Sequence, residues 1–217
     1  MEKGEENLEN KPKSIKISIL GNAGVGKTCI IQRFMLDEFS ENSVSTRGAN
    51  YSNKIIERDD KLFQLDIWDT AGQEQYRSLG RHFYKEAFIV ILVYDITVRE
   101  SFEELKNIWY KDLTKYGEKY TVLAIVGNKI DLYENEAISE DEGRKFAEEV
   151  KALFMLVSAK SGDNIENLFN DLLNAYLEPD FQLKVKEMEQ RDEGSVKIRK
   201  RSKIEEEKLK NSKKKCC

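Results

Sequence analysis

Gly21-Asn22-Ala23-Gly24-Val25-Gly26-Lys27-Thr28 lies between a short apolar run, Ile15–Leu20, and a segment with helical spacing of its apolar residues, Gly26–Glu38. Glycines between a strand and a helix let successive backbone N–H groups turn inward around phosphate oxygens, and the helix N-terminus adds partial positive charge. In this pattern Lys27 reaches the β- and γ-phosphates, and the Thr28 hydroxyl ligates Mg²⁺. A glycine-rich turn with a chance lysine is the alternative, but the strand–loop–helix placement favours a nucleoside triphosphate site. Its predicted contacts are Ala23, Gly24, Val25, Gly26, Lys27, Thr28 and Cys29.

The rest of the chain alternates short apolar runs with longer helical stretches. Two period-two runs flank Asp59-Asp60 and predict a hairpin. The expected strands are Ile15–Leu20, Tyr51–Arg58, Leu62–Trp68, Phe88–Tyr94, Val122–Val126 and Leu153–Val157, and the further helices are Glu100–Tyr116, Ser139–Val150 and Ile165–Leu177. This order predicts an α/β P-loop nucleotide-binding fold with a six-stranded, mostly parallel sheet, one antiparallel edge strand and helices on both faces.

Charge divides the chain into an acidic body and a basic tail. The 217 residues carry a net charge of −4, and residues 181–217 hold 13 Lys and Arg against 7 Asp and Glu, which is +6 and leaves −10 for residues 1–180. A nucleic-acid binder would place positive charge on its folded face, so no nucleic acid is expected as a partner. A basic tail suits an anionic membrane surface. We predict a disordered arm over 1–14, one domain over 15–178 and a flexible tail over 179–217.

The cysteines and the chain's start bear on the compartment. Cys29 lies in an apolar helical stretch, and Cys216-Cys217 ends the chain, so no disulfide framework is expected and a reducing compartment is the simplest interpretation. Met1–Ser14 lacks the apolar core of a signal peptide, and no run of about 18 apolar residues exists to span a bilayer. We therefore expect a protein made in the cytosol that stays on that side of the membrane.

A second motif addresses the base of the nucleotide. Asn128-Lys129-Ile130-Asp131 directly follows the run Val122–Val126. A carboxylate such as Asp131 accepts from the ring N–H and the amine of guanine together, whereas adenine offers no such pair and would leave a buried acceptor unpaired. Asn128 would brace the loops, the Lys129 stem would cover the base, and a backbone N–H of a third string would donate to the guanine carbonyl. That string is Ser158, Ala159 and Lys160.

A third motif concerns hydrolysis. Trp68-Asp69-Thr70-Ala71-Gly72-Gln73-Glu74 ends another predicted strand. Asp69 would hold Mg²⁺ through water, the Gly72 backbone N–H would approach the γ-phosphate, and Gln73 would orient the attacking water. Thr46 would complete the Mg²⁺ coordination when a γ-phosphate is present. The alternative for Asp69 is a helix cap. Lys27 and Gln73 are the predicted catalytic residues.

Over Ile15–Leu177 the sequence resembles the Rab family of Ras-superfamily small GTPases. The strings that carry the resemblance are Phe63–Glu74, Tyr76–Leu79, Phe83–Ala87 and Leu92–Thr97, together with the Cys-Cys end. The resemblance implies that Phe39 packs edge-on against guanine, that the Thr46 loop is switch I and that Thr70 to about Arg81 is switch II. It also implies geranylgeranyl groups on Cys216 and Cys217.

By this resemblance the chain is a GTPase that alternates between GTP and GDP and is slow without an activating protein. The implied partners are an exchange factor, an activating protein, a dissociation inhibitor, an escort protein and effectors that bind the switches of a monomer. The implied place is the cytoplasmic face of endomembranes, exchanging with the cytosol, and the implied role is vesicle trafficking. Arg47 replaces the isoleucine usual in Rabs, and Ala23 lies where small side chains affect hydrolysis. The alternatives are a P-loop ATPase or kinase and a GTP-bound scaffold that never cycles.

Overall fold

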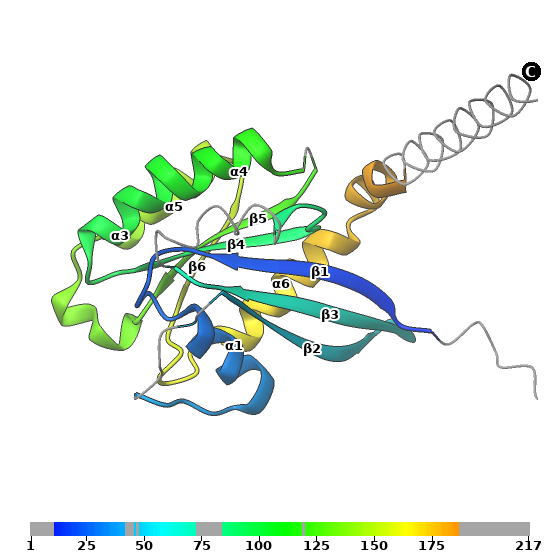
Figure 1. Ribbon diagram of the computed structural model, residues 1–217, viewed down its shortest axis with the longest axis horizontal. Helices are drawn as coiled ribbons and strands as arrows, with labels where there is room; N and C mark the ends of the chain where they lie inside the picture. The colour runs from blue at the N-terminus through cyan, green and yellow to red at the C-terminus, as the bar shows by residue number, and fades with distance from the viewer. Residues whose placement is uncertain (1–10, 42–45, 47, 73–83, 119, 187–217) are drawn as a thin grey trace, which may run out of the picture. The chain divides into compact units, whose positions relative to one another are not determined.

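The computed structural model describes residues 11–41, 46, 48–72, 84–118 and 120–186. The chain forms two compact units, Met1–Tyr176 and Leu177–Cys217. The first unit contains a six-stranded sheet in the order β2-β3-β1-β4-β5-β6 (Figure 1). Its strands are β1 Lys13–Leu20, β2 Ala49–Arg58, β3 Lys61–Thr70, β4 Ile89–Asp95, β5 Val122–Asn128 and β6 Leu153–Val157.

The sheet is parallel except at one edge. β2 pairs antiparallel with β3, and all other neighbouring strands are parallel. The hairpin turns at Asp59 and Asp60, whose φ values of 51° and 57° suit the mirror-image turn that matches strand twist. All seven residues of β4 are buried, because helices cover the central strands on both faces. The predicted fold class, including the antiparallel edge strand, is confirmed.

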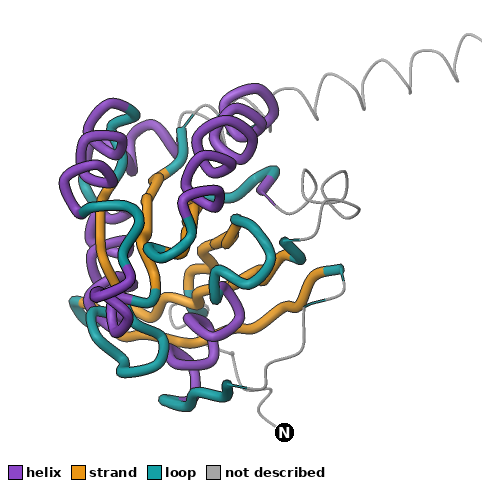
Figure 2. The backbone as a smooth tube through the Cα atoms, turned by 90° about the vertical axis from the view of Figure 1, so that its left-hand side faces the viewer, coloured by secondary structure: helices purple, strands orange, loops and turns teal. Residues whose placement is uncertain are grey.

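Helices flank the sheet on two sides (Figures 1 and 2). The rings of Phe34 in α1 and Phe169 in α6 stack at 3.6 Å. On the other face Phe102 in α3 and Tyr110 in η3 both pack edge-on against Phe146 in α5. The helical segments are α1 Lys27–Leu36, α3 Arg99–Glu104, η3 Leu105–Tyr110, α4 Lys111–Tyr116, η4 Ile130–Asn135, α5 Glu140–Glu149 and α6 Ile165–Leu177.

The helix predicted over Glu100–Tyr116 differs from expectation in its middle. α3, η3 and α4 follow one another without a break, and η3 is a π-helical turn. Such a turn is wider than an α-helical one and shifts the angular position of the residues after it, and it is frequent near functional sites. It buries Trp109, which is only 3% exposed, against the sheet.

The two ends of the chain differ in part from the expected boundaries. β1 begins at Lys13, two residues before the predicted start of the domain. In the second unit residues 179–186 are helical, where the sequence suggested a flexible tail, and Pro179 opens that helix at a position that suits its fixed φ. Residues 187–217 lie outside the described part of the chain. Among the described helices, none combines the length and the apolar character needed to cross a membrane.

Candidate guanine-nucleotide site

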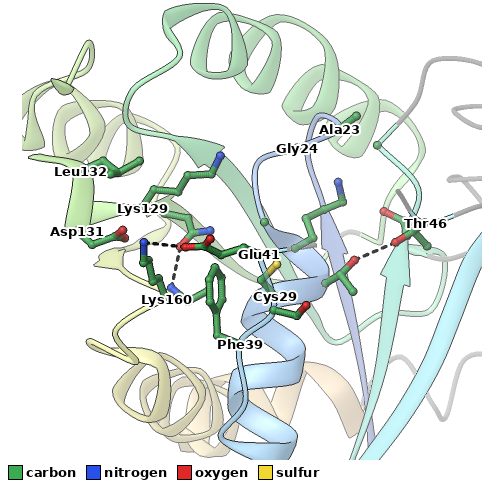
Figure 3. Close-up of a pocket in the computed structure, with 18 residues that line it drawn as sticks. Ala23, Gly24, Cys29, Phe39, Glu41, Thr46, Lys129, Asp131, Leu132 and Lys160 are labelled. Atoms are coloured by element: carbon green, nitrogen blue, oxygen red, sulfur yellow. Dashed lines mark hydrogen bonds and ion pairs between the residues drawn. The ribbon is translucent and has the colours of Figure 1, made fainter. Parts of the chain in front are cut away.

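The three sequence motifs lie together at the end of the sheet where the parallel strands have their carboxyl termini. The phosphate loop follows β1, Asp69 and Thr70 end β3, Asn128 ends β5, and Ser158 follows β6. Ligands bind at this edge in open α/β sheets. A cavity of about 350 Å³ opens there (Figure 3). It is lined by Ala23, Gly24, Gly26, Lys27, Thr28, Cys29, Phe39, Ser40, Glu41, Thr46, Thr70, Gly72, Asn128, Lys129, Asp131, Leu132, Ala159 and Lys160.

Two of the predicted contact residues serve the cavity from behind. Val25 is buried, and its carbonyl accepts a hydrogen bond from Nδ2 of Asn128 at 2.8 Å. Ser158 is fully buried, and its hydroxyl donates to Asp131 Oδ1 at 2.6 Å. Neither Val25 nor Ser158 lines the cavity. Each forms a hydrogen bond to a residue that does, Asn128 or Asp131.

The phosphate loop presents a buried cation. Lys27 is 6% exposed, and its Nζ donates to the carbonyls of Gly21 at 2.8 Å and Asn22 at 2.7 Å. Burial lowers the pKa of Lys27 to about 8, and the nearby Asp69 carboxylate partly opposes that shift. A buried ammonium that donates to carbonyl oxygens is well suited to an anionic ligand, because carbonyls carry no net charge that would neutralise it. Gly26, with φ of 94°, packs so closely on Asn128 that a Cβ would come within 2.3 Å of its Nδ2.

Three oxygen-bearing side chains meet beside the lysine. Thr28 Oγ1 donates to Asp69 Oδ2 at 2.7 Å, Thr46 Oγ1 lies 3.2 Å from the same oxygen, and the two hydroxyls are 2.9 Å apart. Burial raises the pKa of Asp69, against the hydrogen bond from Thr28 and the charge of Lys27. Within the described chain, the buried oxygen Asp69 Oδ1 has no hydrogen-bond partner.

This cluster suits Mg²⁺. Magnesium prefers oxygen ligands at 2.0–2.1 Å in an octahedron, whose edges are then about 2.9 Å long. The hydroxyl oxygens of Thr28 and Thr46 are 2.9 Å apart, so they could take neighbouring positions of such an octahedron while Asp69 contacts the ion through a bound water. The described residues contain no group of three or more His, Cys, Asp or Glu that could hold a metal. A hydroxyl-rich site with one carboxylate would therefore rely on phosphate oxygens and water for its other ligands.

Gly72 approaches the phosphate loop more closely than any other residue type allows. A Cβ built on it would lie 2.3 Å from the Ala23 nitrogen and 2.4 Å from the Asn22 carbonyl oxygen. The neighbouring Ala71 donates its N–H to the Gly48 carbonyl at 2.8 Å, which ties this segment to the residue before β2. Gly72 therefore lies against the phosphate loop near the start of the Thr70–Arg81 segment, while the approach of its N–H to a γ-phosphate stays a prediction. Gln73 and the rest of that segment up to 83 lie outside the described residues.

The guanine end of the cavity is held by Asn128. Its Nδ2 group bonds the phosphate loop, and its Oδ1 accepts the N–H of Ala159 at 3.1 Å. One side chain therefore connects the phosphate loop, β5 and the loop after β6, which agrees with the predicted bracing role. Lys129 takes a left-handed backbone conformation, and its Nζ lies 2.5 Å from Asp95 Oδ2. The sequence did not single out Asp95 as a partner.

The mouth of the cavity is crossed by an ion pair that the sequence did not reveal. Glu41 Oε1 and Lys160 Nζ are 3.0 Å apart, and Figure 3 shows the two side chains turned toward each other next to Phe39. Ser40, Thr70 and Leu132 also line the cavity without having been predicted. Thr70 lies inside the Trp68–Glu74 motif, whereas Ser40, Glu41 and Leu132 could have been indicated only by their position one or two residues after Phe39 or Asp131.

A further contact reaches the phosphate loop from η3. Trp109 Nε1 donates to Asn22 Oδ1 at 2.7 Å. The carbonyl of the same Asn22 accepts from Lys27 and is one of the atoms that Gly72 approaches. The sequence carries no signal for this pair, because neither residue occupies a position of a motif to which a chemical role is assigned.

Comparison with known proteins agrees with this geometry. The Ras family model matches residues 16–178, and the chain belongs to that family of small GTPases. Within it, the chain is 41% identical over 157 residues to human Ras-related protein Rab-30, covering 72% of this chain and 77% of the relative. It is 39% identical over 160 residues to human Rab-22A, covering 74% and 82%, and 40% identical over 154 residues to RABD2a of Arabidopsis thaliana, covering 71% and 75%. The chain is thus Rab-like, and family membership implies guanine-nucleotide and Mg²⁺ binding.

Proposed function

We propose that this chain is a GTP-hydrolysing switch that recruits effectors to endomembranes in vesicle trafficking. The observation that carries the proposal is the union of two half-sites in one cavity, the phosphate side around Lys27 and the base side around Asp131. The Rab-like relatives support the trafficking role. An ATPase or kinase is disfavoured, because Asp131 lies where a carboxylate would pair with guanine and not with adenine.

In this proposal the residues of the chain divide the work of hydrolysis. Lys27 and the loop amides hold the β- and γ-phosphates and stabilise charge on the transferred group. Thr28, Thr46 and Asp69 would hold Mg²⁺, directly or through water, and the bound ion would neutralise charge on the phosphate oxygens. Gln73 orients a water that attacks the γ-phosphorus; the bond to the β-phosphate oxygen breaks, and GDP and inorganic phosphate leave.

The switching follows from which contacts require the γ-phosphate. Thr46 and the Gly72 N–H would be held by the γ-phosphate and Mg²⁺ in the GTP state, which orders both loops for an effector. Hydrolysis removes the anchor, and the loops relax. Arg47 lies beside Thr46 in sequence and outside the described residues; a charge there would make the effector set differ from that of Rabs with isoleucine.

Single-turnover hydrolysis tests the catalytic part. Loaded with GTP, the protein should turn over on the order of 10⁻⁴–10⁻³ per second, the rate scale of unaided Ras. Gln73→Leu should abolish the decay while GTP stays bound. Tight binding with no decay in either protein would favour the second candidate, a GTP-bound scaffold. Ala23 motivates that candidate. This phosphate-loop residue lies against Gly72, at a position where small side chains affect hydrolysis.

The tail supplies the membrane part of the proposal. Geranylgeranyl groups on Cys216 and Cys217, next to Lys213-Lys214-Lys215, would anchor the chain stably, since two lipid signals hold where one chain binds reversibly. A dissociation inhibitor would then be needed for return to the cytosol, and an escort protein for lipidation. An exchange factor and an activating protein would set the timing. Deleting the two cysteines should leave GTP binding intact and release the protein from membranes; continued pelleting with membranes would refute the anchor.

A further inference from the structure

Arg33 lies in α1, outside all three motifs, and its guanidinium donates hydrogen bonds to the loop that follows β6. Its Nε donates to the Ala159 carbonyl at 3.0 Å, and its Nη2 donates to the Lys160 carbonyl at 2.7 Å. The side chain is 15% exposed; its bond to Ala159 is partly buried, and its bond to Lys160 lies at the surface. We propose that Arg33 is a positioning residue that orients the backbone of this loop for the guanine carbonyl. This inference rests on the proposed guanine site.

The same guanidinium also holds the opposite wall of the base end. Its Nη1 donates to Asp37 twice, to the carbonyl at 2.8 Å and to Oδ1 at 3.0 Å. Asp37 ends α1 in a left-handed conformation, and its N–H returns to the Arg33 carbonyl at 2.9 Å. Phe39, two residues further on, lines the cavity. One planar group therefore sets the spacing between the Phe39 side and the Ala159–Lys160 side of the cavity.

Peptide geometry identifies the amide that Arg33 orients. The Ala159 carbonyl and the Lys160 N–H share one peptide, and the described chain contains no cis peptide bond. In a trans peptide the two groups point in opposite directions, so holding the Ala159 carbonyl toward Arg33 turns the Lys160 N–H away from α1. The Ala159 N–H is already donated to Asn128. Lys160 N–H is accordingly the donor whose direction toward a guanine carbonyl depends on Arg33.

The carbonyl contacts, and not the ion pair, carry this role. Asp37 is 92% exposed on its side chain, and an exposed pair of this kind contributes little. The bonds to Ala159 and Lys160 use two donors of a rigid planar fork, and a lysine ammonium cannot reproduce that geometry. Removing the guanidinium would leave the carbonyls of Ala159 and Lys160 without their Arg33 donors. The peptide between the two residues would then be free to rotate.

Base analogues that differ at one atom separate orientation from general stability. In 6-thioguanosine diphosphate a weak acceptor replaces the carbonyl oxygen, while the ring N–H and the amine remain. Inosine diphosphate keeps the carbonyl and lacks the amine that Asp131 would bind. For the full-length protein in excess Mg²⁺, we expect 6-thioguanosine diphosphate to leave about 10-fold faster than GDP, the value of one good hydrogen bond. Inosine diphosphate should also leave faster.

In Arg33→Ala, GDP release should accelerate about 5- to 10-fold while release of the thio analogue changes little, so that the ratio between them falls toward one. The ratio between inosine diphosphate and GDP should stay at its wild-type value. Arg33→Lys keeps the charge and replaces the alanine variant if that variant folds poorly. Its thio ratio, the release rate of 6-thioguanosine diphosphate divided by that of GDP, should also fall. The matched control is Arg58→Ala. Arg58 donates a hydrogen bond of 3.2 Å to Asn170 Oδ1, and neither residue lines the cavity.

The outcomes distinguish the two levels of the proposal. If Arg33→Ala and Arg33→Lys release all three nucleotides faster by the same factor, Arg33 is only structural and the inference is overturned. If the wild-type protein releases the three nucleotides at one rate, the proposed reading of guanine itself fails. A thio ratio that falls in both Arg33 variants and stays unchanged in Arg58→Ala supports the positioning role.

Discussion

Gly72→Ala tests how closely the second switch must approach the phosphate loop. The added Cβ would lie 2.3 Å from both the Ala23 nitrogen and the Asn22 carbonyl carbon. Carbon atoms in contact are normally about 3.5 Å apart, so the segment must retreat by about 1 Å. No rotamer change relieves the overlap, because the atoms that it meets belong to the backbone.

The retreat should affect hydrolysis and spare nucleotide binding. A displacement of about 1 Å in a reacting site can lower the rate about 100-fold. We therefore expect single-turnover GTP hydrolysis by Gly72→Ala to fall by about that factor. GDP release should stay close to wild type, because the lysine, the guanine loop and Asn128 keep their contacts. Rapid quench of GTP-loaded protein measures the first rate, and displacement by excess nucleotide measures the second.

Gly48→Ala is the matched control for this change. Its Cβ would meet no atom within 4 Å, so the substitution carries only the backbone strain of φ 83°, about 1–2 kcal/mol. Stability should fall slightly while hydrolysis remains within a few-fold of wild type. Hydrolysis by Gly72→Ala at the wild-type rate would refute the reasoning, because it would mean that the close approach is not needed for catalysis.

Three shorter predictions concern other parts of the chain. Trp109→Phe keeps a smaller aromatic ring and removes the indole donor to Asn22, so GDP release should accelerate about 5-fold in a nucleotide-displacement assay, and an unchanged rate would contradict a role for this bond. Asp131→Asn reverses part of the acceptor pattern, so binding should shift from GDP toward xanthosine diphosphate, which calorimetry measures; retained preference for GDP would count against Asp131 as the base reader. Cys216→Ser and Cys217→Ser together should move the protein from the membrane pellet to the supernatant, whereas either alone should leave partial binding.

The residues proposed to do chemistry stand out in the sequence because each motif is short and follows a recognisable strand. Lys27 and Thr28 stand at set positions in a glycine-rich loop, and Asp131 stands three residues after Asn128. Such spacing can be recognised without knowledge of the remaining structure. Motifs that follow parallel strands also come together, because the carboxyl ends of these strands lie at the same end of the sheet. The sequence by itself therefore determined the fold class, and it supplied the predictions of a phosphate loop and of a carboxylate that pairs with guanine.

Tertiary structure alone decided how these residues are held. Arg33 bonds a carbonyl 126 residues away, and Trp109 bonds a side chain 87 residues away. Neither pair has a spacing or a residue type that distinguishes it from ordinary helix surface and core. The π-helical turn that presents Trp109 likewise has no mark in the hydrophobic periodicity. Contacts of this kind depend on the angle between packed elements and on which backbone carbonyls the loops turn outward, and such angles arise only when the whole sheet and its helices assemble.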